Sequence, residues 1–252
     1  MMMKSIFVLV TTAGLLCAWP AGAATLATSD SRETIFTQHG LDNLSLGGMF
    51  EILKRDMQED RGGGKIRLQA YNYYGYLGYD FWERLTLFGT VGASQAKTAE
   101  DDEHGNAGVK WSAGLNLKIW HIDLNDPTFI AGRYSIRAMS EYSHYRSGEK
   151  DATWFKWQDL YAALTVNYEI FVAEMSATEK YPYSLLLYLG PAISSVDGKQ
   201  ETSNQTNDFS EEHTIGIAAG VDLFASHNLS LGGQLQFYFD EPTVSVSVIY
   251  NF

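Results

Sequence analysis

The chain has 252 residues, of which 45% are hydrophobic and 13% aromatic, a size that fits one large or two small domains. Its 30 acidic and 18 basic residues give a formal net charge of -12, and the basic residues form no cluster. Because a polyanion is bound by a concentrated positive surface, nucleic acid is excluded as a partner. The 15 Tyr, 6 Trp and 23 Gly suit a strongly curved sheet that meets a boundary between polar and apolar surroundings.

The first segment, residues 1–23, has the features of a secretory signal peptide. Lys4 supplies the positive start, an apolar region covers residues 5–18, and small residues precede the expected cleavage after Ala23. An apolar run of about 14 residues is too short for a membrane helix, which needs ~20. We therefore expect export and cleavage near Ala23, and then a short periplasmic lead at residues 24–42.

The only cysteine, Cys17, lies within this signal, and the residues before it do not match a lipoprotein box. The mature chain is therefore expected to lack disulfides, thiol catalysis and thiolate metal sites. After the signal, no run approaches ~18 consecutive apolar residues, so helical membrane spans are excluded. The exported chain is then soluble in the periplasm, released from the cell, or a membrane β-barrel.

The C-terminal segment favours the barrel. Apolar residues at every second position alternate there with mostly small or polar residues, a pattern that places one set on each face of a strand. The apolar set is Val244, Val246, Val248, Tyr250 and Phe252. These residues resemble the C-terminal signature of bacterial outer-membrane proteins, in which a last Phe follows apolar residues at alternate positions. The resemblance implies a Gram-negative outer-membrane barrel that depends on periplasmic chaperones and the barrel-assembly machinery.

Alternation of the same kind recurs along the chain and predicts ten strands. In the second of them, the alternation changes phase, which indicates a β-bulge. Many of these segments reach the ~9 to 11 residues of a tilted membrane strand once their polar ends are included, and soluble strands are shorter. The segments are 44–52, 66–79, 85–93, 109–119, 130–138, 160–172, 185–193, 215–223, 229–240 and 243–252.

The links between these segments alternate in length. Compact links at 80–84, 121–127, 176–183 and 225–228 alternate with mostly longer, more polar links at 56–64, 96–106, 143–153 and 194–212, and a last short one at 240–243. Bacterial barrels have short periplasmic turns, longer extracellular loops, an even strand number and both termini inside. The sequence thus predicts an all-β fold: a single antiparallel up-and-down transmembrane barrel of about ten strands that covers residues 43–252.

Aromatic residues are expected to form a girdle at each edge of the membrane, as in other barrels. One group lies near the compact links and the other near the longer ones. The first is Tyr79, Phe81, Trp82, Trp120, Phe171, Tyr181, Tyr183 and Phe224, and the second is Tyr142, Tyr145, Trp154, Phe155, Trp157, Phe237 and Phe239.

If apolar residues face lipid, strand parity directs nine charged side chains into the lumen. They could line a selective conduit, above all Arg133 and Arg137, or pair with one another as a plug. In a barrel only slightly wider than eight strands, opposite charges tend to pair, which favours the plug. The nine residues are Glu51, Arg55, Lys110, Lys118, Arg133, Arg137, Glu141, Glu169 and Asp222.

No motif indicates an enzyme or a cofactor. His104, His144 and His213 lie near carboxylates in or near the predicted outer loops, where a His–carboxylate pair could activate water. Outer-membrane proteases and lipid hydrolases use comparable groups, but their residues do not align here and no His-x-Ser motif occurs. The acidic runs at 101–103 and 211–212 lack the spacing of a calcium loop, so we expect neither a metal nor a cofactor.

The sequence therefore predicts a structural or surface-interaction barrel with a plugged lumen and no catalytic activity, in contact with outer-membrane lipid and lipopolysaccharide. A narrow porin-like channel for small polar solutes is the alternative, and an outer-membrane protease or lipid hydrolase is a second one. The oligomeric state stays open.

Overall fold

The computed structural model describes ten stretches of the chain: residues 43–59, 64–82, 84–98, 105–124, 132–147, 153–171, 184–202, 206–224, 228–239 and 242–252. The expected signal peptide and periplasmic lead, residues 1–42, lie outside them. Within the described residues, no helix is long and apolar enough to cross a membrane.

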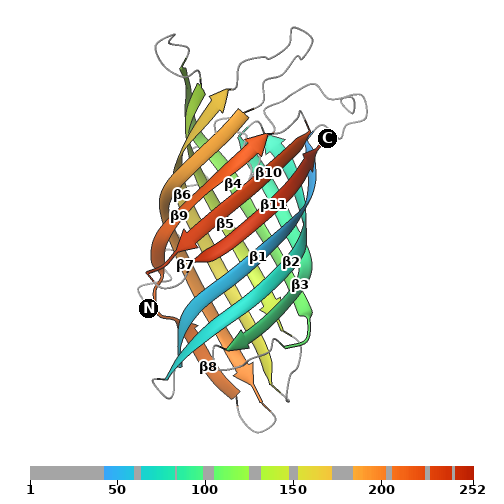
Figure 1. The fold of residues 1–252 in the computed structure, drawn as a ribbon, viewed down its shortest axis with the longest axis vertical. Helices are drawn as coiled ribbons and strands as arrows, with labels where there is room; N and C mark the ends of the chain where they lie inside the picture. Colours follow the sequence, from blue (N-terminus) through green and yellow to red (C-terminus); the bar gives the residue numbers. More distant parts are fainter. Residues whose placement is uncertain are drawn as a thin grey trace.

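Eleven antiparallel strands form one sheet that closes on itself, as Figure 1 shows. Neighbours in sequence pair along most of the sheet, and β11 pairs with β1 to close the barrel, with Ser45 opposite Asn251 and Ile52 opposite Val244. The strands are β1 (Leu44–Glu59), β2 (Lys65–Trp82), β3 (Leu85–Thr98), β4 (Gly108–Leu124), β5 (Gly132–Arg146), β6 (Trp154–Phe171), β7 (Ser184–Glu201), β8 (Thr206–Glu211), β9 (Ile215–Phe224), β10 (Leu229–Phe237) and β11 (Thr243–Asn251).

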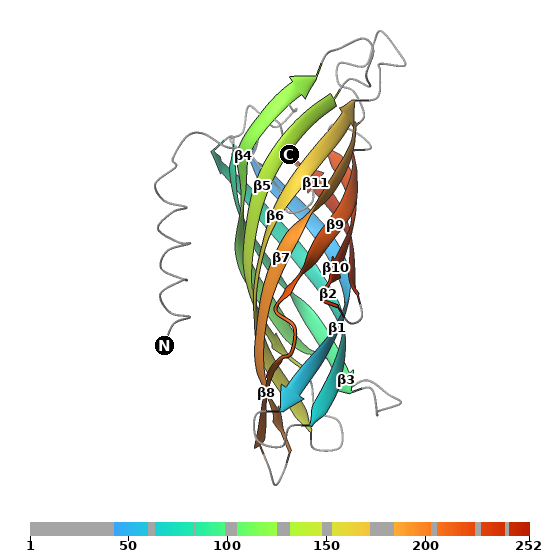
Figure 2. The same cartoon turned by 90° about the vertical axis from the view of Figure 1, so that its left-hand side faces the viewer.

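Ten of these strands make the closed antiparallel barrel that the sequence predicted, so the predicted fold class is confirmed. The extra strand is β8, which lies in the segment 194–212 that was predicted to be a loop. β8 pairs with the last part of β7 and, on its other side, with residues Met57–Glu59 of β1. We call the end with the start of β1 and the end of β11 the terminal end, and the opposite end the β8 end (Figures 1 and 2).

The predicted bulge in the second strand lies slightly later than expected. The register of β2 against β3 shifts between Asp80 and Trp82, beyond the predicted segment 66–79. Tyrosines occupy both faces of β2, with Tyr73 exposed and Tyr74 and Tyr76 buried. Because both faces carry the same residue type, the alternation in the sequence changes phase within 66–79, whereas the register stays continuous up to Asp80.

From the terminal end to the level at which β9 and β11 begin and β10 ends, the barrel has an apolar outside and a polar inside. On β6, for example, Leu164 and Val166 are exposed, and Asn167 and Glu169 are buried. We call the exposed apolar surface the belt. Its members include Leu46, Tyr73, Leu77, Leu87, Val91, Val109, Leu115, Leu164, Val166, Leu187, Leu189, Ile193, Ile217, Val221, Leu231, Leu235, Val246 and Val248.

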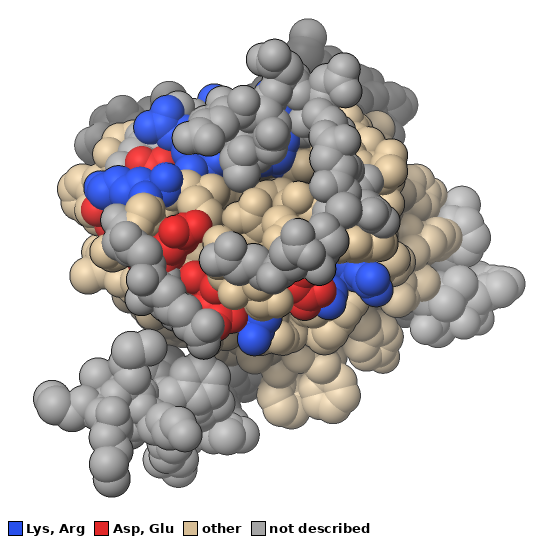
Figure 3. Space-filling model, turned by 90° about the horizontal axis from the view of Figure 1, so that it is seen from below, with Lys and Arg blue, Asp and Glu red and all other residues tan. Residues whose placement is uncertain are grey.

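Beyond that level, the pattern inverts. On β1, Leu53 and Met57 are buried, and Lys54 and Asp56 lie on the opposite face of the strand. The same change occurs on the other strands that continue, which we call the protruding lobe: residues 53–59 of β1, 65–70 of β2, 94–98 of β3, 143–146 of β5, 154–159 of β6, 194–201 of β7, and β8. An apolar interior with a charged exterior is the pattern of a sheet in water. Seen from the β8 end, acidic and basic side chains are interspersed around the lobe (Figure 3).

Candidate functional site: the barrel lumen

The middle of the lumen is built around one buried cation, Lys110 of β4. Its Nζ lies 3.8 Å from Glu51 Oε1 and 3.4 Å from the centroid of the Tyr74 ring. Asn72 Nδ2 donates to the same Glu51 oxygen at 2.7 Å, and the Tyr74 hydroxyl donates to Oε2 at 3.4 Å. Lys110 and Glu51 therefore compensate each other's charge inside the barrel, with three strands supplying the contacts.

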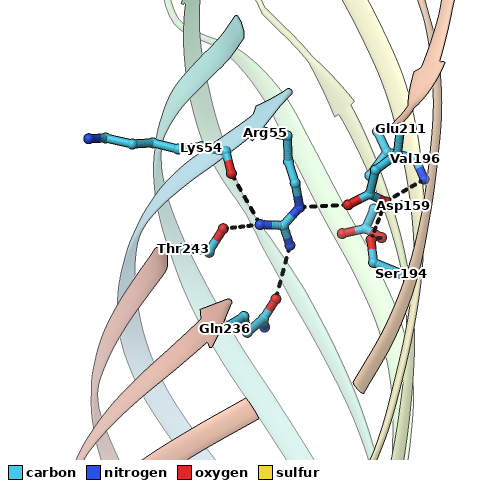
Figure 4. A network of polar contacts seen from close by, with 8 residues as sticks. All are labelled: Lys54, Arg55, Asp159, Ser194, Val196, Glu211, Gln236 and Thr243. Carbon is cyan, nitrogen blue, oxygen red and sulfur yellow. Dashed lines mark hydrogen bonds and ion pairs between the residues drawn. The ribbon is translucent and has the colours of Figure 1, made fainter. Parts of the chain in front are cut away.

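Nearer the β8 end, the buried guanidinium of Arg55 joins β1 to three other strands (Figure 4). Arg55 Nε is 3.0 Å from Glu211 Oε1, at the end of β8, and both side chains are almost fully buried, at 3% and 2% exposure. Arg55 Nη1 donates to Thr243 Oγ1 at the start of β11, and Nη2 donates to Gln236 Oε1 of β10 at 3.2 Å. The guanidinium also lies 4.1 Å from the centroid of the Tyr238 ring. A planar group with five donors is suited to such a junction.

A second buried carboxylate lies behind Glu211. Ser194 Oγ of β7 is 2.7 Å from Glu211 Oε2 and 3.1 Å from Asp159 Oδ1 of β6, and one of the two accepts its single proton. The backbone N–H of Val196 also donates to Glu211 Oε2, at 3.2 Å (Figure 4). Glu211 is thus held by β1 and β7 together, and β8 is anchored on both sides.

An apolar cluster fills the interior of the protruding lobe. Trp157 and Tyr145 stack with their ring centroids 4.7 Å apart and an interplanar angle of 6°, and Met57 is completely buried beside them. We call this cluster the apolar plug: Leu53, Met57, Leu68, Ala70, Ala96, Tyr145, Phe155, Trp157, Val196 and Phe209. It lies between the charged lumen and the β8 end.

The nine charged residues assigned to the lumen from sequence differ in burial and in their positions along the barrel. Seven of them are buried: Glu51, Arg55, Lys110, Lys118, Arg137, Glu169 and Asp222. Glu141 is half-buried and accepts a hydrogen bond from Ser143 Oγ at 3.2 Å. Arg133 lies at the terminal end, where its Nε is 2.6 Å from Asp123 Oδ1. The two arginines expected to line a conduit together, Arg133 and Arg137, thus have different surroundings, because Arg137 is buried near Asp222 deeper in the barrel.

Among the described residues, the cavities in the lumen include two of about 30 Å³ each, and Met139 and Gln234 line both. Arg137, Asp222 and Tyr188 line the first, and Glu51, Tyr74 and Gln236 are among the residues that line the second. Among the described residues, no hydrogen-bond partner reaches Asp222 Oδ1 or the Tyr188 hydroxyl. A volume of this size accommodates about two water molecules.

Two of the three candidate histidines lie beside aromatic rings. No group of three or more potential metal ligands occurs among the residues that the structure describes. His144 lies 5.8 Å from the Trp111 ring on the outside of the barrel, and His213 lies 6.2 Å from the Phe239 ring. His104 and the acidic residues 101–103 lie outside the described stretches.

No protein-family model matches the sequence, and a search of curated proteins finds no relative. Similar solved structures include the transport unit of the autotransporter AIDA-I from Escherichia coli, at 11% identity and a TM-score of 0.42, covering 89% of this chain and 94% of that one. An outer-membrane channel from Pseudomonas putida F1 is 10% identical with a TM-score of 0.38, covering 90% and 100%. The translocator domain of the autotransporter NalP from Neisseria meningitidis is 10% identical with a TM-score of 0.32, covering 85% and 92%. Likeness of this degree assigns the chain neither a family nor a function.

Sequence reasoning missed the partners of Arg55 and the plug. Glu211 was assigned to a solvated acidic loop, but it is buried at the end of β8. Tyr145, Phe155 and Trp157 were assigned to an aromatic girdle, but they point inward. Phe224 is also buried, and Tyr181, Tyr183 and the Phe171 side chain lie outside the described part. Phe155 and Trp157 share one face of β6 with Asp159 and Tyr161, and this parity was the available signal.

Proposed function

We propose that this chain is an integral outer-membrane β-barrel whose lumen is closed in its resting state, with a structural or surface-interaction role and no chemistry of its own. The observation that carries the proposal is the inversion of the inside–outside pattern along single strands. A barrel that is apolar outside over one part and charged outside beyond it fits a molecule that passes from lipid into water.

The belt supports the membrane assignment because so much exposed apolar surface is incompatible with a protein that stands in water. Soluble monomers rarely expose contiguous apolar patches above about 600 Å². Here, large apolar side chains are exposed on ten strands around the barrel. Exposed aromatic residues mark both edges: Tyr79, Trp82, Trp120 and Tyr134 near the terminal end, and Tyr73, Trp111 and Phe237 toward the β8 end. Barrels place such residues at the two membrane–water interfaces.

The orientation follows from the termini. Bacterial barrels keep both termini on the periplasmic side, so the terminal end faces the periplasm and the lobe projects outward. β11, with Val246, Val248 and Tyr250 exposed toward lipid, then carries the signal that the assembly machinery reads. The lobe is the part offered to lipopolysaccharide and to the cell's surroundings.

Two barriers support a closed lumen. The apolar plug removes polar groups from the path at the β8 end, and the paired charges of Lys110 with Glu51 and Arg55 with Glu211 occupy the polar part. Two cavities of about 30 Å³ leave space for water molecules but not for a hydrated solute. This favours the plugged barrel over the porin-like channel.

Fractionation and conductance test the proposal together. The protein is expected in the outer-membrane fraction, to change its gel mobility on boiling, and to give no steady current in planar bilayers. A chain that stays soluble without detergent contradicts the membrane assignment. Steady unitary currents from the unmodified barrel contradict the closed lumen, and cleavage of peptides or lipids by the purified protein contradicts the absence of chemistry.

A further inference from the structure

β8 is attached to the barrel by little backbone pairing. It pairs with β1 through Met57–Glu59 and with β7 through Asp197–Glu201, whereas β1 and β2 pair from Leu44 to Gln58. β9 and β8 lie on the same side of β7, and the regular pairing is interrupted between Glu211 and Ile215. Single backbone hydrogen bonds cross this interval, from Ser194 N to Thr214 O and from Glu212 N to Asp56 O. β8 is thus a short strand between two long ones, β7 and β1. It lies just beyond the level at which β9 and β11 begin and β10 ends.

Two inward side chains hold β8 in place. Phe209 is buried in the apolar plug, and Glu211 forms the ion pair with Arg55. The same guanidinium donates to Gln236 and Thr243, so one side chain connects β8 to the end of β10 and the start of β11 (Figure 4). With Arg55 replaced, Glu211 becomes a buried charge without its cation, a state that is strongly unfavourable until the carboxylate reaches water.

Arg55 also separates β8 from the lumen. Gln236, which accepts its hydrogen bond, lines the cavity that contains Glu51, Gln234 and Ser245. The path from this cavity to the outside therefore passes Arg55 and then β8, whose Asn207 and Phe209 lie level with Phe155 and Trp157 across β7. Removal of β8 withdraws Phe209 from the plug and opens the wall between β7 and β1 at the level of the plug, so that the lumen is exposed sideways.

We propose that β8 is a releasable door and that the barrel has a second, conducting state in which water and small inorganic ions pass through this side opening. The solute class follows from the route, which is narrow and lined by Gln234, Gln236, Glu51 and Ser245. The inference rests on the proposed membrane barrel and adds an open state to its closed one.

The test combines a loosened door with a reversible lock. Arg55→Gln is expected to turn the silent barrel into one that gives intermittent currents in planar bilayers. Gln58 and Ser210 are cross-strand partners between β1 and β8, so Gln58→Cys/Ser210→Cys in the Arg55→Gln background forms the lock. The only natural cysteine is Cys17, in the segment expected to be removed on export. Oxidation should abolish the currents, and dithiothreitol should restore them.

The matched control places a disulfide where no opening is proposed. His144 and Gln158 are cross-strand partners between β5 and β6, and oxidation of His144→Cys/Gln158→Cys should leave the Arg55→Gln currents unchanged. Phe209→Ser is a second way to loosen β8, through its contact with the plug, and should give the same lockable currents. Boiling-dependent gel mobility verifies that each variant has folded.

Folded Arg55→Gln and Phe209→Ser barrels that both stay silent overturn the door. Currents that persist with the Gln58→Cys/Ser210→Cys disulfide closed also overturn it, because the path then lies elsewhere. Steady currents from the wild-type barrel that the lock leaves unchanged refute the closed resting state of the proposed function, which is a different outcome.

Discussion

At the scale of single residues, the lumen consists of charges held by specific neighbours rather than a general polar surface. Lys110 has one carboxylate and two aromatic rings, Tyr74 and Tyr145, within 5.1 Å. Arg55 has one carboxylate, one ring and two side-chain acceptors. Removal of one partner from such a site lowers the stability far more than removal of both, because a single buried charge has no compensation.

A double-mutant cycle at Glu51 and Lys110 tests this coupling. Glu51→Gln leaves the Lys110 ammonium buried with a neutral neighbour and should lower the free energy of unfolding by about 3 kcal/mol. Lys110→Met should cost a comparable amount, and the double variant clearly less than the sum of the two. Urea unfolding of the reconstituted barrel measures all three. Strictly additive effects would mean that the two groups do not interact.

Trp157 tests the apolar plug at the same scale. Its side chain is 1% exposed, stacks on Tyr145 and belongs to the cluster that fills the lobe. Trp157→Ala should lower the free energy of unfolding by about 3 to 5 kcal/mol, since it leaves a cavity in a packed core. Trp154→Ala, three residues away on the opposite face of β6, is the control and should cost much less. If both substitutions lowered the free energy of unfolding by the same small amount, both rings would lie at the surface.

At the scale of strands, alternation predicted the elements well but their lengths poorly. The sequence segments 185–193 and 160–172 correspond to the belt portions of β7 and β6. β7 continues into residues 194–201, which were assigned to a loop, and β6 includes residues 154–159, which were assigned to no strand. Charged residues such as Lys199 favoured a loop, because a lipid-facing strand excludes them. A strand in water accepts charge on its outer face. The rule that outward-facing residues are apolar therefore identifies the belt but fails in the lobe.

The register of β6 locates the edge of the belt. Val166 is exposed in the middle of the belt, and Gln158 lies on the same face in the lobe. Val166→Arg should lower the free energy of unfolding in a bilayer by about 2 to 4 kcal/mol, whereas Gln158→Arg should change it by about 1 kcal/mol or less. Urea titration in lipid vesicles gives both values. A large effect at Gln158 would move the membrane edge into the lobe.

The pairing between the first strand, β1, and the last strand, β11, closes the barrel. Phe252 N donates to Leu44 O at 3.0 Å, and the Phe252 ring lies 5.1 Å from the Tyr250 ring. Deletion of Phe252 removes both the contact and the terminal residue of the outer-membrane signature, and should lower the amount of boiling-sensitive barrel in the outer membrane. Deletion of residues 101–104, in a link between strands, is the control and should reduce it less. A larger loss of barrel from the loop deletion than from the Phe252 deletion would mean that assembly does not depend on the C-terminal signature.

At the scale of the whole molecule, the barrel joins two kinds of sheet on continuous strands. The belt has the composition of a membrane barrel and the lobe that of a soluble one, so a single strand such as β1 belongs to both. The sequence contains this information, because the apolar residues of β1 change from even positions up to Ile52 to odd positions from Leu53 onward. It is visible only once the membrane edge is known, which is why Glu211 and the plug were not predicted.

Amide hydrogen exchange of the reconstituted barrel tests whether the lobe is a folded extension. Protection follows the free energy of local opening, and packed cores protect their strands as loops do not. We expect the amides of β1, β2, β6 and β7 in the lobe to exchange nearly as slowly as those in the belt, because the plug holds these strands together. β8, with its short pairing, should exchange faster than its neighbours by about tenfold or more, which corresponds to ~1.4 kcal/mol in opening free energy. If the whole lobe exchanged at the rate of free loops, the plug would not be a stable core. If β8 were as protected as β7, it would be a fixed part of the wall.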